Sequence, residues 1–168
     1  MAKKELIERR SIIETTAIFS ESEMDRYLLR MSWDDSKKKA VIIMASPSSA
    51  DEYILDQTTM LCRNGAIRSD FGSITIVNLT SSIGAENPKS SKQNSAVIMI
   101  ACEEADCILC CWGRGTSMTE EKEAMLDALK SYKDKLYTLV DSKGLEFSHP
   151  LSPYAHNWNI KKLDHRKI

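Results

Sequence analysis

The sequence predicts an α/β protein: a three-layer α/β/α sandwich around a mainly parallel four-stranded central sheet, with an added N-terminal β-hairpin or edge strands. Two observations predict this fold. Four short apolar runs are bounded by turn-forming residues, which is typical of strands buried on both faces; they occupy 40–45, 73–79, 106–112 and 135–140. Helical segments separate these runs, and strands that alternate with helices favour a parallel sheet covered on both sides.

The first elements along the chain are two β-rich runs, "TTAIFS" and "RYLLRMSW", separated by the polar "ESEMD". They predict the N-terminal hairpin or edge strands. Residues 1–17 are predicted to be an N-terminal extension, in which the charged residues 1–10 could form a short helix. Residues 154–168 are predicted to be a loose basic tail. The length of 168 residues predicts a single domain.

Three helices are predicted between the core strands, at 56–65, 94–105 and 118–132. Asp56 is placed as the N-cap of the first helix and Gly65 as its stop. The second helix is mostly apolar, and its length favours helix over strand. Ser117 and Glu120 have the spacing of a capping box for the third. Four side chains share one face of that helix, namely Met118, Met125, Leu129 and Tyr132.

Composition limits the classes of function. The net charge of -1 gives no overall basic field for a nucleic-acid backbone, so such binding would need a local patch. No apolar run approaches the roughly 20 residues of a membrane span, which predicts no membrane partner. The charged start "MAKKELIERR" lacks a following apolar stretch and predicts no secretory signal. Five cysteines without such a signal predict a reducing, cytoplasmic location.

Neither a metal nor another cofactor is predicted. The three histidines are scattered at His149, His156 and His165, without metal-ligand spacing. Cys107, Cys110 and Cys111 lie in an apolar strand-like run, where alternation sends Cys110 to the face opposite the other two. We interpret the cysteines as small buried apolar residues.

Polar residues follow each of the four apolar runs. These segments, 46–51, 78–82, 112–116 and 142–149, are rich in hydroxyls, amides and glycine. Ligands of parallel α/β sheets bind at the carboxyl ends of the strands, so the segments predict one pocket for a nucleobase or nucleotide. The residues expected to line it are Ser46, Pro47, Ser48, Ser49, Asn78, Trp112, Gly113, Arg114 and His149.

The same motifs carry a family resemblance. "RYLLRMSWDD", "SPSSADE", "DQTTMLCR", "VNL", "CWGRG" and "HPLSP", in this order, resemble the bacterial, archaeal and phage family called domain of unknown function 1643, over about residues 18–153. A more distant resemblance is to uracil-DNA glycosylases. "IIMASPSS", "TIVNL", "LCCWGRG" and "SHPLSP" are similar to four of their motifs in the same order.

The glycosylase resemblance implies roles for individual residues. His149 would donate a hydrogen bond to a base carbonyl, although a surface-loop histidine is an equal alternative. Asn78 would read a base edge with its amide, or else tie adjacent loops together. Ser46 departs from the glycosylase pattern, which has an Asp or Asn at this position. A serine is not a base at neutral pH, so activation of water from this position is not expected. Asp51 and Asp56 are the remaining candidate catalytic carboxylates, for which helix or turn capping is the alternative role.

Other residues are candidates for contacts to phosphate or to the base. The hydroxyls of Ser48 and Ser49 lie in a loop that could hold a phosphate. Arg114 could clamp a phosphate and Trp112 could stack on a base, or both could be structural. Phosphate or nucleic-acid contacts are further predicted for Arg26, Arg30 and Arg63. Alternation places the first two on one strand face as a cationic strip, unless aspartates neutralise them.

Three hypotheses remain open at this stage. The first is a pocket that captures a nucleotide or nucleobase unchanged, and that in a phage could sequester a nucleotide signal of host defence. The second is an N-glycosidic hydrolase of the glycosylase type, acting on DNA or on nucleosides. The third is a non-catalytic protein-interaction module. The missing carboxylate or amide at Ser46 and the near-neutral charge favour the first.

Overall fold

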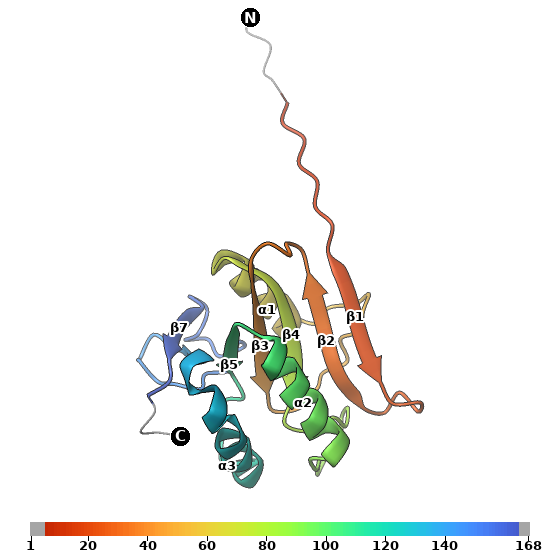
Figure 1. Ribbon diagram of the computed structural model, residues 1–168, viewed down its shortest axis with the longest axis vertical. Coiled ribbons are helices and arrows are strands. Elements are labelled where there is room, and N and C mark those ends of the chain that lie inside the picture. The colour runs from red at the N-terminus through yellow and green to blue at the C-terminus, as the bar shows by residue number, and fades with distance from the viewer. Residues whose placement is uncertain (1–5, 165–168) are drawn as a thin grey trace, which may run out of the picture.

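The computed structural model describes residues 6–164, which form one seven-stranded mixed sheet with helices on both faces (Figure 1). The strands are β1 (Glu14–Phe19), β2 (Arg26–Ser32), β3 (Lys38–Met44), β4 (Phe71–Asn78), β5 (Cys107–Cys110), β6 (Leu136–Val140) and β7 (Asn159–Lys162). The helices are α1 (Gln57–Arg68), α2 (Lys92–Glu104) and α3 (Thr119–Ala128), which continues into a 3-10 helix, η1 (Leu129–Lys135).

The order of strands in the sheet is β1-β2-β4-β3-β5-β6-β7. The neighbours β4, β3, β5 and β6 run parallel, while β1, β2 and β7 are antiparallel to their neighbours. The predicted α/β class is therefore confirmed. The predicted sheet of four strands is too small, because antiparallel strands extend the parallel part on both sides into a mixed sheet of seven.

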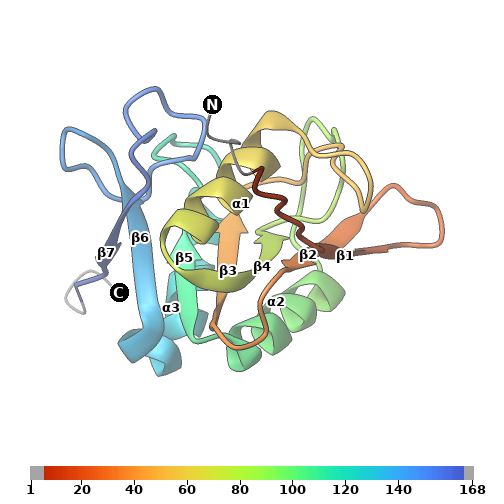
Figure 2. The same cartoon turned by 90° about the horizontal axis from the view of Figure 1, so that it is seen from above.

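Helix α1 covers one face of the sheet, and α2 and α3 cover the other (Figure 2). An apolar cluster lies on each side of the sheet. On one face, Cys62 and Ala66 of α1 pack with Ile42 and Ile76 of the sheet. On the other face, helices α2 and α3 pack over the alternate strand residues, among them Ile43, Val77 and Ile108. Cys107 and Cys111 belong to the first cluster and Cys110 to the second, so the predicted alternation of the cysteines is confirmed.

Two predictions about helix ends are wrong. Helix α1 does not stop at Gly65 but continues to Arg68. Gly65 serves packing and not a helix end, since it lies against the ring of Trp158, where a side chain would collide. Helix α3 has no side-chain cap, so Ser117 and Glu120 form no capping box; Met118 precedes it in the left-handed conformation (φ 58°).

The predictions for the two chain ends also need correction. Residues 6–10 form no helix, and residues 14–17 of the expected extension belong to β1. Residues 159–162 of the expected loose tail form β7, which pairs with β6. Leu163 is buried against the α3 side of the core. Residues 1–5 and 165–168, including the remainder of both predictions, lie outside the described residues.

Candidate functional site

Asn78 ends β4 at the carboxyl end of the parallel strands, as the sequence predicted. Its side chain is only 1% exposed. The amide oxygen Oδ1 accepts a hydrogen bond from Nη2 of Arg26 (3.4 Å). The backbone carbonyl of Asn78 accepts one from the side chain of Asn94 on α2 (2.9 Å). Asn78 therefore holds a fixed position between the sheet, β2 and α2.

Arg26 opens β2 and is as deeply buried as Asn78, at 1% exposure. Its Nη1 donates to the backbone carbonyls of Ala50 (2.7 Å) and Ser48 (3.4 Å). Burial lowers the pKa of this guanidinium, and the charge of Asp56 partly offsets the effect. The guanidinium thus connects β2 to the loop that follows β3, beneath the surface of the strand ends.

Asp56 lies next to this guanidinium as the N-cap of α1. Its Oδ1 accepts a hydrogen bond from the backbone N–H of Thr59 (2.7 Å), which satisfies one of the free donors of the first helical turn. Burial raises the pKa of Asp56, but hydrogen bonds from Ser48 and Thr59 and the charge of Arg26 outweigh it, so the net pKa is lowered. The carboxylate is ionised at neutral pH and already has hydrogen-bond donors.

His149 is half-buried in the loop after β6 and interacts with the same carboxylate. Burial lowers its pKa, and the charge of Asp56 opposes this only in part, so the ring is neutral at pH 7. Nδ1 accepts a hydrogen bond from the N–H of Leu151 (3.1 Å). In a neutral ring the proton must then lie on Nε2. A Cβ added to Gly113 would lie 3.6 Å from Cβ of His149, so the loops after β5 and β6 are adjacent.

Arg26 and Asn78 each have one buried hydrogen-bond donor without a partner among the described residues. Nε of Arg26 and Nδ2 of Asn78 are buried and have no hydrogen-bond partner among the described residues. Nε2–H of His149 likewise has no protein acceptor there. Buried polar atoms are nearly always hydrogen-bonded, so exceptions call for a specific explanation. We call Arg26, Asp56, Asn78 and His149 the strand-end cluster.

The loop after β3 contributes hydroxyls and one turn. Ser46 and Ser49 are exposed, whereas Pro47 is buried. The hydroxyl of Ser46 lies 3.4 Å from that of Thr80. Asp51 accepts hydrogen bonds from the N–H groups of Tyr53 and Ile54 (2.8 and 2.7 Å), which lower its pKa. Both candidate carboxylates, Asp51 and Asp56, therefore have the capping role that was the alternative to catalysis.

Two residues predicted to contact the ligand have side chains that contact other side chains of the protein. Trp112 is 5% exposed, and its ring stacks on Phe147 with centroids 5.4 Å apart, which does not fit stacking on a base. Arg114 is ion-paired with Asp141 (2.9 Å), whose side chain is fully buried. Sequence reasoning missed Asp141, although it is the first residue after β6 and the strand-end rule points to it.

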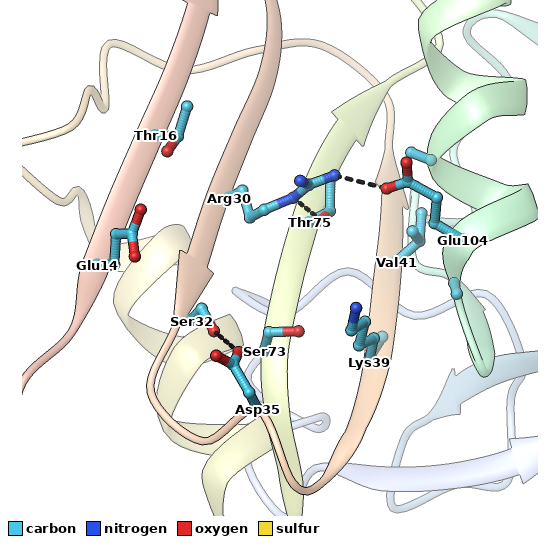
Figure 3. A pocket seen from close by; sticks show the side chains of 13 residues that line it. Glu14, Thr16, Arg30, Ser32, Asp35, Lys39, Val41, Ser73, Thr75 and Glu104 are labelled. Atoms are coloured by element: carbon cyan, nitrogen blue, oxygen red, sulfur yellow. Dashed lines mark hydrogen bonds and ion pairs between the residues drawn. The ribbon is translucent and has the colours of Figure 1, made fainter.

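Arg30 and Arg63 are not part of the strand-end cluster. Arg30 donates to Thr75 (3.2 Å) and pairs with Glu104 of α2 (3.0 Å), so it forms no cationic strip with the buried Arg26. Arg30 lines a polar hollow of about 240 Å³. Figure 3 shows it there together with Lys39 and Ser73 from the amino ends of β3 and β4. This hollow is at the opposite end of the sheet. Arg63 lies in the middle of α1, and its Nε has no described partner.

The described residues 6–164 contain no cluster of three or more His, Cys, Asp or Glu side chains that could hold a metal ion. Over the same residues, every helix is too short or too polar to cross a bilayer. A family model described as "Protein of unknown function (DUF1643)" matches residues 26–151. No curated protein and no solved structure matches the chain.

Proposed function

The chain belongs to the DUF1643 family, and because that description states no activity, we propose from the geometry that it binds a nucleotide or nucleobase at the strand-end cluster and releases it unchanged. The observation that carries this proposal is the pair of buried donors without partners, Nε of Arg26 and Nδ2 of Asn78. An acceptor-rich ligand would satisfy both, and Nε2–H of His149 would supply a third donor.

A nucleobase fits these donors because its edge carries carbonyl oxygens and ring nitrogens that accept hydrogen bonds. The exposed hydroxyls of Ser46 and Ser49 and the positive charge of Arg26 suit the phosphate of a nucleotide. The order of motifs shared with uracil-DNA glycosylases supports the same class of ligand. Since the carbonyls of Ser48 and Ala50 cover Arg26, the proposal includes a displacement of this loop when the ligand binds.

Binding is favoured over glycosidic hydrolysis by the state of the carboxylates. A general base must accept a proton from water near neutral pH, and an aspartate does so best when its pKa is raised. The pKa values of Asp51 and Asp56 are lowered instead, and both carboxylates accept backbone hydrogen bonds. Ser46, in place of the usual Asp or Asn, cannot supply the missing base.

The proposal is tested by melting the full-length protein with a panel of nucleotides, nucleosides and free bases. A ligand at a hundred times its dissociation constant adds about 2.7 kcal/mol to the free energy of unfolding. We expect one ligand class to raise the melting temperature and to be recovered unchanged by mass spectrometry. His149→Gln should remove the shift, whereas His156→Gln, which changes an exposed histidine, should keep it.

Other outcomes favour the alternative functions. Release of free base from uracil-containing DNA or from a nucleoside, lost in Asp51→Asn or Asp56→Asn, would identify a hydrolase. If no ligand shifts the melting temperature and no base is released, the cluster is structural, and the protein-interaction hypothesis takes its place. A shift that His149→Gln leaves intact would put the ligand elsewhere.

A further inference from the structure

The segment before β1 is extended and strongly exposed. Residues 6–13 lead away from the rest of the protein (Figure 1), and the exposed fractions of Leu6, Ile7 and Ile12 are 97%, 81% and 86%. The segment continues into β1, an edge strand whose one partner among residues 6–164 is β2. An edge strand with exposed apolar residues readily pairs with another chain. We call residues 6–13 the N-terminal arm.

We propose that residues 6–18 of two copies of this chain pair as antiparallel strands across a twofold axis, so that each arm covers the β1 edge of the other copy. The inference is independent of the proposed ligand. The outcome would be a dimer in which two sheets join at their β1 edges. Such pairing is isologous, because the same segment forms both sides of the contact.

Symmetry leaves few registers for this pairing. Paired residues of an antiparallel sheet point to the same face, so residues opposite each other must both be even-numbered or both be odd-numbered. The contact is therefore centred on a single residue, which faces itself. The registers that pair at least three residues of the arm with residues 14–18 of the other copy are centred on Ser11, Ile12, Ile13 or Glu14.

The register centred on Ile12 places apolar side chains opposite apolar ones and places opposite charges face to face. It places Leu6 opposite Ile18, which is 45% exposed, and Ile7 opposite Ala17. It also places Arg10 opposite Glu14, twice by symmetry. Apolar pairs and pairs of opposite charge both stabilise an antiparallel sheet when they lie directly opposite each other.

The neighbouring registers place unfavourable pairs of side chains opposite each other. Centring on Ser11 places Glu8 opposite Glu14, and centring on Glu14 places the two Glu14 carboxylates opposite each other. Both arrangements bring like charges together. Centring on Ile13 places Ile12 opposite Glu14. The sequence of the arm therefore selects one alignment, the one centred on Ile12.

The two charged side chains are available for this contact. Glu14 lines the edge of the polar hollow in Figure 3 and has no hydrogen-bond or ion-pair partner among the described residues. Arg10 pairs only with Glu8 there (2.7 Å), and these side chains are 87% and 72% exposed. Ion pairs this exposed contribute little to stability, so Arg10 can exchange Glu8 for Glu14 of the second copy.

Charge exchange tests both the dimer and its register. The molecular mass of the full-length protein, measured by sedimentation or light scattering over a range of concentrations, should approach that of a dimer. Arg10→Glu and Glu14→Arg should each weaken the dimer about tenfold or more, because each places like charges opposite each other twice. The double variant, and a mixture of the two single variants, should restore it.

Arg9→Glu is the matched control, since it makes the same charge change on the other face, opposite Thr15, and should leave dimerisation unaffected. A monomer at all concentrations would overturn the proposal. So would a dimer that is insensitive to both reversals, or one that the double variant does not restore.

A cysteine at position 12 gives a covalent test. In the proposed register Ile12→Cys faces itself, within the Cα separation that a disulfide allows, whereas Ser11→Cys is displaced by two residues and is too far from its own copy. The five native cysteines are buried and would not compete. Mild oxidation should crosslink Ile12→Cys much faster than Ser11→Cys, and equal rates would overturn the register.

Discussion

The buried carboxylate of Asp141 accepts a hydrogen bond of 2.9 Å from Nη2 of Arg114. Its other oxygen accepts bonds of 2.9 Å from the N–H groups of Lys143 and Leu145. Arg114 belongs to the loop after β5 and Asp141 to the loop after β6. Because His149 follows in the second loop, this ion pair helps to fix the geometry of the strand-end cluster without being part of it.

Asp141→Asn should lower the melting temperature at pH 7. The hydrogen bond from Leu145, followed by that from Lys143 and the charge of Arg114, holds the pKa of Asp141 below 3.8, although burial opposes this. A lowered folded-state pKa gives stability that is complete well above 3.8 and is lost as the pH falls through the folded pKa. The difference in melting temperature from the wild type should therefore shrink as the pH falls below 4.

The control for this variant is Asp127→Asn, which removes only an exposed ion pair with Lys130 and should change the melting temperature little. A difference for Asp141→Asn that stays constant into acid would show that the ionised carboxylate is not the stabilising species.

Gly65→Ala should destabilise the protein, although alanine is the better helix former by about 1 kcal/mol. An added Cβ would enter the space of the Trp158 ring, and overpacking a core costs about 1–3 kcal/mol. In a Trp158→Ala chain, which lacks the ring atoms at this contact, Gly65→Ala should cost much less than in the wild type. Denaturant unfolding measures both variants. A stabilised Gly65→Ala would mean that the ring moves aside freely.

Much of the fold could be predicted from local pattern. The apolar runs that predicted strands at 40–45 and 73–79 are β3 and β4, because residues buried on both faces must be apolar throughout. Strand β7 was missed for the converse reason. Its sequence, Asn159–Lys162, is largely exposed and carries no apolar alternation, and only its pairing with β6 makes it a strand. Gly65 was wrongly predicted to end the helix. The reason for a glycine there is the ring of Trp158, which leaves no room for a side chain and lies far along the chain.

The site was predictable in part. The strand-end rule pointed to Asn78 and His149, which the structure relates through Arg26 and Asp56, and their role in a site stays a prediction. The burial of Arg26 could not be predicted, since it depends on the loop carbonyls of Ser48 and Ala50. From the sequence alone, an arginine at the start of a strand is expected to be a surface cation. The ligand itself stays a prediction.

Asp56→Ala and Asp56→Asn separate two roles of one carboxylate. Alanine removes the N-cap of α1, which costs about 1 kcal/mol, and it also removes the charge beside Arg26. Asparagine can cap the helix nearly as well but carries no charge. We expect Asp56→Ala to be the less stable variant by denaturant unfolding. Equal losses would show that the charge beside Arg26, and not the cap, is what stabilises the fold.

The five cysteines should react slowly with thiol reagents in the folded protein. All are buried, and burial raises the pKa of Cys102, Cys107 and Cys111 to about 12 and those of Cys62 and Cys110 well above the usual value. Since the thiolate is the reactive form, almost none is present at neutral pH. A colorimetric thiol assay should detect five thiols only after unfolding. Fast reaction of any one would indicate local opening of its strand or helix.

His149 should make the stability of the protein depend on pH in a defined window. Burial holds its folded pKa below the ordinary 6.5, and Asp56 offsets this only in part. As the pH falls through 6.5 the unfolded chain takes up a proton at this ring while the folded chain does not, so the free energy of unfolding decreases until the folded pKa is reached. His149→Gln removes this contribution. The melting temperature of the wild type should therefore fall more steeply than that of the variant between pH 6.5 and 5, and His156→Gln should follow the wild type. A wild type that gains stability over the variant in acid would mean that Asp56 holds the ring in its charged form, in which Nδ1 could no longer accept from Leu151.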